Sequence, residues 1–120
     1  MQRSAVAYLA DIVESCEAIE SALDGVDAEA YVASRLIRSA VEREFIIIGE
    51  AVGCLRRLDP ELEELITHAR MIVAFRNRLA HDYAAIDDEA VLRIAEHDVS
   101  LLRTECEALL ARMTPVGESD

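Results

Sequence analysis

The sequence contains no lysine and no tryptophan, and it has only four glycines and two prolines in 120 residues. All twelve basic residues are arginines, and 24 aspartates and glutamates outnumber them, so the formal net charge is -12 at pH 7. Such an acidic chain is a poor general binder of nucleic acid or of an anionic membrane surface. Any contact with phosphate therefore requires a local group of arginines.

Cysteines are also few, and Cys16, Cys54 and Cys106 lie far apart, without the close spacing of a zinc site. Each falls on an apolar helical stripe, which predicts three buried free thiols in a reducing compartment. The first twenty residues carry early acidic groups and no long apolar run, so we expect no signal peptide. The longest apolar run, FIIIG, is too short to span a bilayer. We therefore expect a cytoplasmic protein with no membrane association, no metal and no cofactor.

What the sequence does have is helical periodicity, because apolar residues recur every three or four positions along most of its length. Four main helices are predicted, at residues 4–23, 28–58, 60–80 and 88–109. The last seven residues, 114–120, include proline and glycine and lack an apolar pattern, so we expect a flexible tail there. The remainder, residues 1–113, is predicted to form one helical domain.

Short polar segments separate these helices and carry start and stop signals. Gly25 follows the first helix and fits a C-terminal stop, and Asp27 is placed to cap the second helix. Asp59 stands directly before a proline, which is a favourable start for the third helix. Either Asp87 or Asp88 caps the fourth helix.

The second predicted helix has the broadest apolar surface. Its apolar positions include Val32 and Leu36, and the turn at residues 45–48 is apolar on every side. Gly49 and Gly53, four residues apart, either permit a close helix crossing or mark a bend. Four amphipathic helices with short connections predict an all-α fold, an antiparallel up-and-down bundle. Because the second helix has more apolar surface than three neighbours need, we expect a homodimer.

The segment RNRLAHDY, residues 76–83, concentrates polar chemistry in the third predicted helix. On a helical wheel Arg76 lies in the middle of the apolar stripe, where its charge needs a partner, and Glu50 is one candidate. Tyr83 falls within about 20° of Arg76, whereas His81 falls about 140° away. Either the helix breaks near His81, or two copies of the motif combine across a dimer.

These residue types suit cleavage of a phosphodiester without a metal. Arginine offers a charged fork to a phosphate, and histidine carries protons near neutral pH. Asn77 and Tyr83 add hydrogen-bonding groups beside them. The plainer alternative is a buried arginine paired with a carboxylate from another helix, a surface histidine and a packing tyrosine.

Arg76, His81 and Tyr83 have the spacing R-x4-H-x-Y, which resembles the motif of HEPN-domain proteins of the HepT type. The stretch EREFIIIGEA, residues 42–51, resembles the second-helix signature of that family. The stretch FRNRLAHDYAAIDDEAVLRIAEHDVSLL resembles its C-terminal half. Together the resemblance covers residues 28–110, which makes it more specific than the short motif alone.

The resemblance implies a small helical bundle that dimerises and acts as a metal-independent endoribonuclease, the toxin of a type VII-like toxin–antitoxin pair. Its partner would be a minimal nucleotidyltransferase (MNT) antitoxin that transfers AMP from ATP to the motif tyrosine. By position, Arg76 and His81 are catalytic, Asn77 supports them, and Tyr83 is the modified residue. One motif histidine per chain is one short of an acid–base pair, and a dimer would supply two.

Two interpretations therefore stay open. Arg70 precedes the motif and Arg78 lies within it, and both are candidate RNA contacts, since a small positive cleft can exist on an acidic body. The intact Arg–His–Tyr set favours the nuclease. Net acidity and the single motif histidine favour the alternative, a non-catalytic helical module that binds a nucleotidyltransferase and presents substrate to it.

The other two histidines carry a weaker signal. His68 lies in ITHAR, and His97 lies in AEHDV between Glu96 and Asp98. Neither segment has the Glu-x-x-His spacing of di-iron helical bundles. We interpret both as solvated helix faces.

Overall fold

A computed structural model describes residues 3–113, apart from the side chain of Tyr83. The elements are α1 (Ala5–Ala22), α2 (Ala28–Ala33), α3 (Arg35–Leu58), α4 (Pro60–Glu63), α5 (Ala69–His81), the 3-10 turn η1 (Tyr83–Ala85), α6 (Asp88–His97) and α7 (Val99–Met113). Every element in this described part is helical, so the all-α prediction is confirmed. The predicted tail, residues 114–120, lies outside the described residues.

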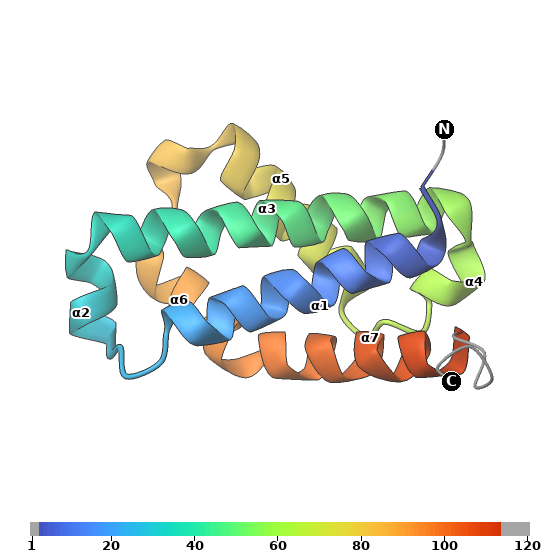
Figure 1. Cartoon of the computed structure of the whole chain (residues 1–120). Helices are drawn as coiled ribbons and strands as arrows, with labels where there is room; N and C mark the ends of the chain where they lie inside the picture. Colours follow the sequence, from blue (N-terminus) through green and yellow to red (C-terminus); the bar gives the residue numbers. More distant parts are fainter. Residues whose placement is uncertain (1–2, 114–120) are drawn as a thin grey trace.

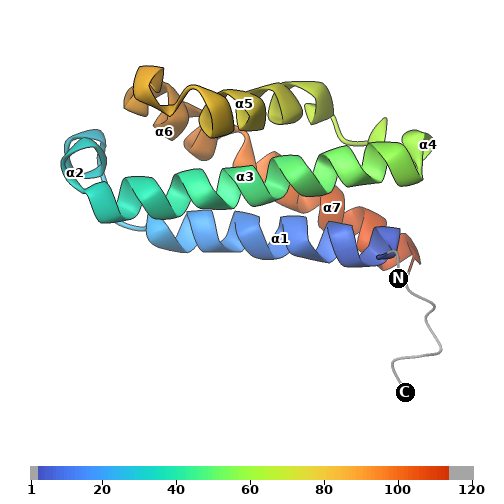
Figure 2. The same ribbon diagram turned by 90° about the horizontal axis from the view of Figure 1, so that it is seen from above.

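The long helices α1, α3, α5 and α7 alternate in direction, as an antiparallel up-and-down bundle requires (Figure 1). Helix α3 is central: it packs against α1 on one side and α5 on the other, and α1 also packs against α7 (Figure 2). The central position explains why the turn at residues 45–48 is apolar all round. Phe45 and Ile48 are buried, while the two isoleucines between them are half-buried.

The predicted second helix is in fact two helices. Ser34 breaks it with an extended backbone conformation (φ -103°, ψ 102°), and its hydroxyl accepts a hydrogen bond from Ile37 N at 3.2 Å to begin α3. A serine hydroxyl can compete with helical hydrogen bonding in this way and is favoured at N-caps. The prediction that Val32 and Leu36 belong to the buried stripe is wrong, because they are 41% and 83% exposed.

The predicted third and fourth helices are also divided. Helix α4 ends at Glu63, and an irregular turn precedes α5. Thr67 in this turn donates through its backbone N–H and its hydroxyl to the Glu105 carboxylate of α7, with the N–O distance at 3.1 Å. Asp98 separates α6 from α7. A contact between residues 38 positions apart holds the first of these breaks, so local periodicity could not reveal it.

The predicted helix boundaries are otherwise confirmed. Gly25 has a positive φ of 72° after α1, where a side chain would be strained. Asp27 and Asp59 each accept a hydrogen bond from the backbone N–H three residues on, at 2.8 and 3.2 Å. Asp87 is the residue that caps α6, while Asp88 is already helical.

Two of the three cysteines are buried as predicted. Cys16 of α1 and Cys106 of α7 are fully enclosed, and burial raises the pKa of each thiol to about 12. The prediction is wrong for Cys54, which is half-buried near the C-terminal end of α3 and contacts the guanidinium of Arg57. Across the described residues, no helix combines the length and the apolar character that a membrane span requires.

Candidate active site

Helix α5 approaches α3 closely at Gly49. A Cβ atom placed on Gly49 would lie 2.2 Å from Arg76 Cβ and 2.5 Å from Arg76 Cγ, so only glycine fits there. One turn away, Phe45 and Phe75 pack edge to face with ring centroids 5.2 Å apart. The close helix crossing offered by the sequence is thus confirmed at Gly49. At Gly53 a Cβ would meet only the end of the Arg57 side chain, at 4.0 Å.

Arg76 is held from two sides at this crossing. Its Nη2 donates to Glu50 Oε1 at 2.8 Å, and its Nη1 donates to Asn77 Oδ1 at 3.0 Å. The prediction that Arg76 needs a partner is confirmed, and Glu50, which the sequence offered as one candidate, is that partner. Arg76 Nε is buried and has no hydrogen-bond acceptor among the described residues. The two hydrogen bonds fix the Arg76 side chain in place, and because it is 25% exposed it still reaches solvent.

A groove opens beside Arg76, between α3 and α5. Its volume is about 320 Å³. It is lined by Gly49, Glu50, Gly53, Cys54, Arg57, Val73, Arg76 and Asn77. The groove therefore presents two guanidinium groups and one amide beside a single carboxylate, which suits a phosphate more than the acidic body of the protein does.

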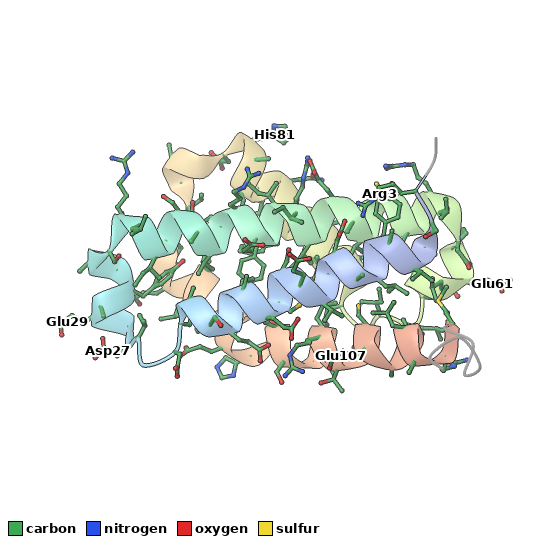
Figure 3. The ribbon with its side chains drawn as sticks, in the orientation of Figure 1. Arg3, Asp27, Glu29, Glu61, His81 and Glu107 are labelled. Atoms are coloured by element: carbon green, nitrogen blue, oxygen red, sulfur yellow. The ribbon has the colours of Figure 1, made fainter. Side chains whose placement is uncertain are left out.

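His81 is the last residue of α5 and is exposed. Figure 3 shows its side chain at the outer edge of the molecule, pointing away from the bundle. It makes no hydrogen bond or ion pair with any residue that the structure describes. A helix separates Arg76 from His81 by about 7.5 Å along its axis and about 140° around it. One chain thus holds Arg76 against α3 and presents His81 outward, as the helical wheel predicts.

Most of this chain matches a known protein family. The family model described as "Ribonuclease HepT-like" matches residues 12–109. This chain belongs to the HepT-like ribonuclease family. The "Probable ribonuclease HepT" of Thermococcus cleftensis is 30% identical over 113 residues, which cover 91% of this chain and 98% of that protein. The "Putative RNase MJ1380" of Methanocaldococcus jannaschii is 31% identical over 108 residues, or 88% and 96% of the two chains. No solved structure gives a significant match.

The tyrosine of the HepT-like motif does not continue the helix. Helix α5 ends at His81, Asp82 terminates it with a non-helical backbone, and Tyr83 opens η1. The wheel angle between Tyr83 and Arg76 assumed an unbroken helix and is therefore wrong. The predicted modification falls on the Tyr83 side chain, which lies outside the described part of the structure.

The two candidate RNA-contacting arginines lie on α5, outside the groove of Arg76. Arg70 lines a pocket of about 450 Å³ between α4 and the start of α5, together with Arg56 and His68. Arg78 lines a small pocket of about 60 Å³ under the loop that follows η1. In this chain the groove is instead lined by Arg76 and Arg57. Sequence reasoning missed Arg57, whose only signal was its position two turns after Glu50 on one helix.

The remaining histidines lie away from this groove. His68 is half-buried, and its Nε2 lies 3.9 Å from Asp98 Oδ1, while His97 is exposed at the end of α6. Within residues 3–113, no group of three His, Cys, Asp or Glu side chains is placed to hold a metal ion.

Proposed function

We propose that this HepT-like chain is an endoribonuclease toxin that cleaves RNA with Arg76 and His81 and without a metal. The observation that carries the proposal is Arg76, fixed by Glu50 and Asn77 beside an open groove, in a chain of a ribonuclease family. The proposed site of action is the cytoplasm, where RNA and ATP are available.

The chemistry follows from the residues present. A base removes the proton of the RNA 2'-hydroxyl, whose oxygen then attacks the adjacent phosphorus, and an acid protonates the departing 5'-oxygen. Arg76 donates hydrogen bonds to the phosphorane oxygens as negative charge develops on them. Histidine serves as the proton carrier, because the exposed His81 imidazole is free to reach a bound strand.

Cleavage by purified protein in EDTA tests this step. We expect wild type to cut single-stranded RNA in EDTA and His81→Ala to lose about 10²–10⁴-fold in rate, while helical content and melting temperature stay close to wild type. Cleavage that disappears in EDTA and returns with magnesium would contradict the metal-free mechanism. Equal rates for wild type and His81→Ala would favour the non-catalytic binding module.

The proposed active form is a homodimer in which two motifs share one cleft. The outward position of His81 supports this, since one chain leaves it away from Arg76 and offers only one motif histidine. Met71 and Ala74 are also exposed on α5 and could pack against a second copy.

Mixed dimers test the shared cleft. Wild type and His81→Ala chains are co-refolded at equal amounts, and total cleavage is compared with that of wild type alone. If both histidines serve one cleft, only wild-type homodimers cleave, and activity falls to about one quarter rather than about one half. A monomer in light scattering that still cleaves RNA would also contradict the proposal.

The proposed regulation is AMP transfer to Tyr83 by an MNT-type nucleotidyltransferase antitoxin. AMP adds bulk and a phosphodiester charge two residues from His81, which would obstruct and repel RNA. Incubation with the partner and ATP should add the mass of AMP to wild type and not to Tyr83→Phe. An unchanged mass, or AMP mapped to Tyr8 or Tyr31, would defeat this part of the proposal.

A further inference from the structure

The groove beside Arg76 has a second arginine at its far end. Arg57 comes from α3, seven residues after Glu50, which places its Cα about 10 Å further along the helix axis. Gly49, directly before Glu50, and Gly53, between Glu50 and Arg57, line the groove and add no side chains to it. The groove therefore lies along α3 and is lined by both arginines.

The guanidinium of Arg57 has no carboxylate partner. Its Nη2 contacts Cys54 Sγ at 3.2 Å, and no Asp or Glu in the described part of the chain forms an ion pair with it. Its Nη1 lies 4.0 Å from the position that a Cβ of Gly53 would take, so the side chain folds back over Gly53. Arg57 thus keeps a charged fork for a ligand, although acidic residues outnumber basic ones two to one.

We propose that Arg57 binds a backbone phosphate of the RNA strand, one to three nucleotides from the phosphate held by Arg76. Both guanidinium groups line one groove, and successive phosphates of a stacked strand follow one another at a rise of about 3.4 Å, so neighbouring phosphates of a short single-stranded segment fit the pair. Arginine suits this role because its fork bonds two oxygens of one phosphate. This inference rests on the proposed ribonuclease function and names the residue that positions the strand in the groove.

The neighbouring residue Arg56 supplies a matched control. Arg56 and Arg57 are both exposed at the end of α3 and carry the same charge. Arg56 lines the other pocket, beside Arg70 and His68, and does not line the groove. Arg56→Ala therefore removes one positive charge from the same end of the molecule without touching the proposed phosphate site.

The binding experiment uses the His81→Ala protein, which is not expected to cut its ligand, and a fluorescently labelled single-stranded RNA. Affinity is measured by anisotropy across a range of salt concentrations. We expect Arg57→Ala to weaken binding about tenfold at low salt and to reduce the slope of log K against log salt by about 0.7, the value for one lost phosphate contact. Arg56→Ala should change both quantities much less. Arg57→Lys should keep the slope, since it keeps the charge.

The kinetics of RNA cleavage, measured in proteins that keep His81, give a second readout. Arg57→Ala should raise KM by a similar factor and leave kcat within about twofold, because Arg57 binds the strand away from the reacting phosphate. Equal effects of Arg56→Ala and Arg57→Ala on the salt slope, in a wild type that cleaves RNA, would overturn this inference alone. A wild type that neither binds nor cleaves RNA would overturn the proposed function and this inference with it.

Discussion

Two arginines of nearly equal exposure, Arg76 and Arg103, join pairs of helices in different ways. Arg103 of α7 donates through Nε and Nη2 to both carboxylate oxygens of Glu20 on α1, at 2.6 and 3.2 Å, and through Nη1 to Glu107 at 3.0 Å. Arg76 of α5 meets one carboxylate oxygen, from Glu50, and an amide. The Arg103 side chain is 27% exposed and the Arg76 side chain 25% exposed. The two sites therefore differ in the number of carboxylates that each arginine contacts and not in exposure.

The number of carboxylates decides what each arginine can do. Arg103 is over-neutralised by two carboxylates, so the Arg103 site repels a phosphate and serves to fasten α7 to α1. Its bond to Glu20 raises the pKa of the Arg103 guanidinium, which keeps the charge in place. Arg76 is balanced by one exposed carboxylate and borders a groove. Figure 3 shows His81 and Glu107 at opposite edges of the molecule.

Replacing each arginine by methionine should give the largest difference between the two sites. Arg76→Met should lower the rate of RNA cleavage by about 10²–10³-fold, because it removes the donors that stabilise the developing charge. Arg103→Met should leave the rate within about twofold. Single-turnover cleavage at saturating protein measures both. Similar losses in the two variants, with folding intact, would remove the distinction between a functional and a structural arginine.

The glycines of α3 offer a second contrast with effects of opposite sign. Gly49→Ala places a Cβ 2.2 Å from Arg76 Cβ, so α5 must shift, and we expect a loss of about 1–3 kcal/mol in unfolding free energy. Gly53→Ala meets only the end of a flexible side chain at 4.0 Å, so the better helix propensity of alanine should add about 0.5–1 kcal/mol. Urea unfolding measures both values. A stabilising Gly49→Ala would show that the crossing is loose.

These contrasts also mark what the sequence could predict. The helical period and the caps Asp27 and Asp59 depend on local spacing, and the need of Arg76 for a partner follows from its place in the apolar stripe, so these were predictable. Glu50 lies on another helix, so it could be offered only as one candidate partner. The residue that packs against Gly49, Arg76, was not predictable, because it depends on how α5 crosses α3. The two arginines of the groove come from different helices, so only the packed structure brings Arg57 beside Arg76.

Two of the failed predictions are helix breaks that the apolar period did not show. A periodic apolar pattern continues through Ser34 and through the turn after α4, yet the helices break at both places. At Ser34 the break is stabilised by a side-chain cap, and after α4 by hydrogen bonds from Thr67 to Glu105. Neither break contains a glycine or proline, so the usual stop signals are absent. The exposed Leu36 is the consequence of the first break.

Neutralising the carboxylate partner of each arginine should change the unfolding free energy by smaller and unequal amounts. Glu20→Gln should lower the unfolding free energy by about 1 kcal/mol, since it weakens a two-oxygen contact within a three-residue network. Glu50→Gln should change it by less than about 0.5 kcal/mol, because Glu50 is 57% exposed and makes one contact. Urea unfolding at low and high salt gives both values, and the difference should shrink at high salt. Equal values at low salt would contradict the comparison.

The smallest expected effect is the pH dependence contributed by the thiols of the α1–α7 region. Burial raises the pKa of Cys16 and Cys106 to about 12 in the folded protein, whereas an unfolded thiol titrates near about 8.5. The folded state therefore binds more protons than the unfolded state once the pH approaches about 8.5, so this contribution to stability is complete only below about pH 7 and is lost as the pH rises toward about 12. Between pH 7.0 and 8.0 we expect the unfolding free energy to fall by about 0.3 kcal/mol from these two thiols. The double variant Cys16→Ala, Cys106→Ala should lose this decline, while Cys54→Ala, at the groove, should retain it. A decline that persists unchanged in the double variant would assign it to other groups.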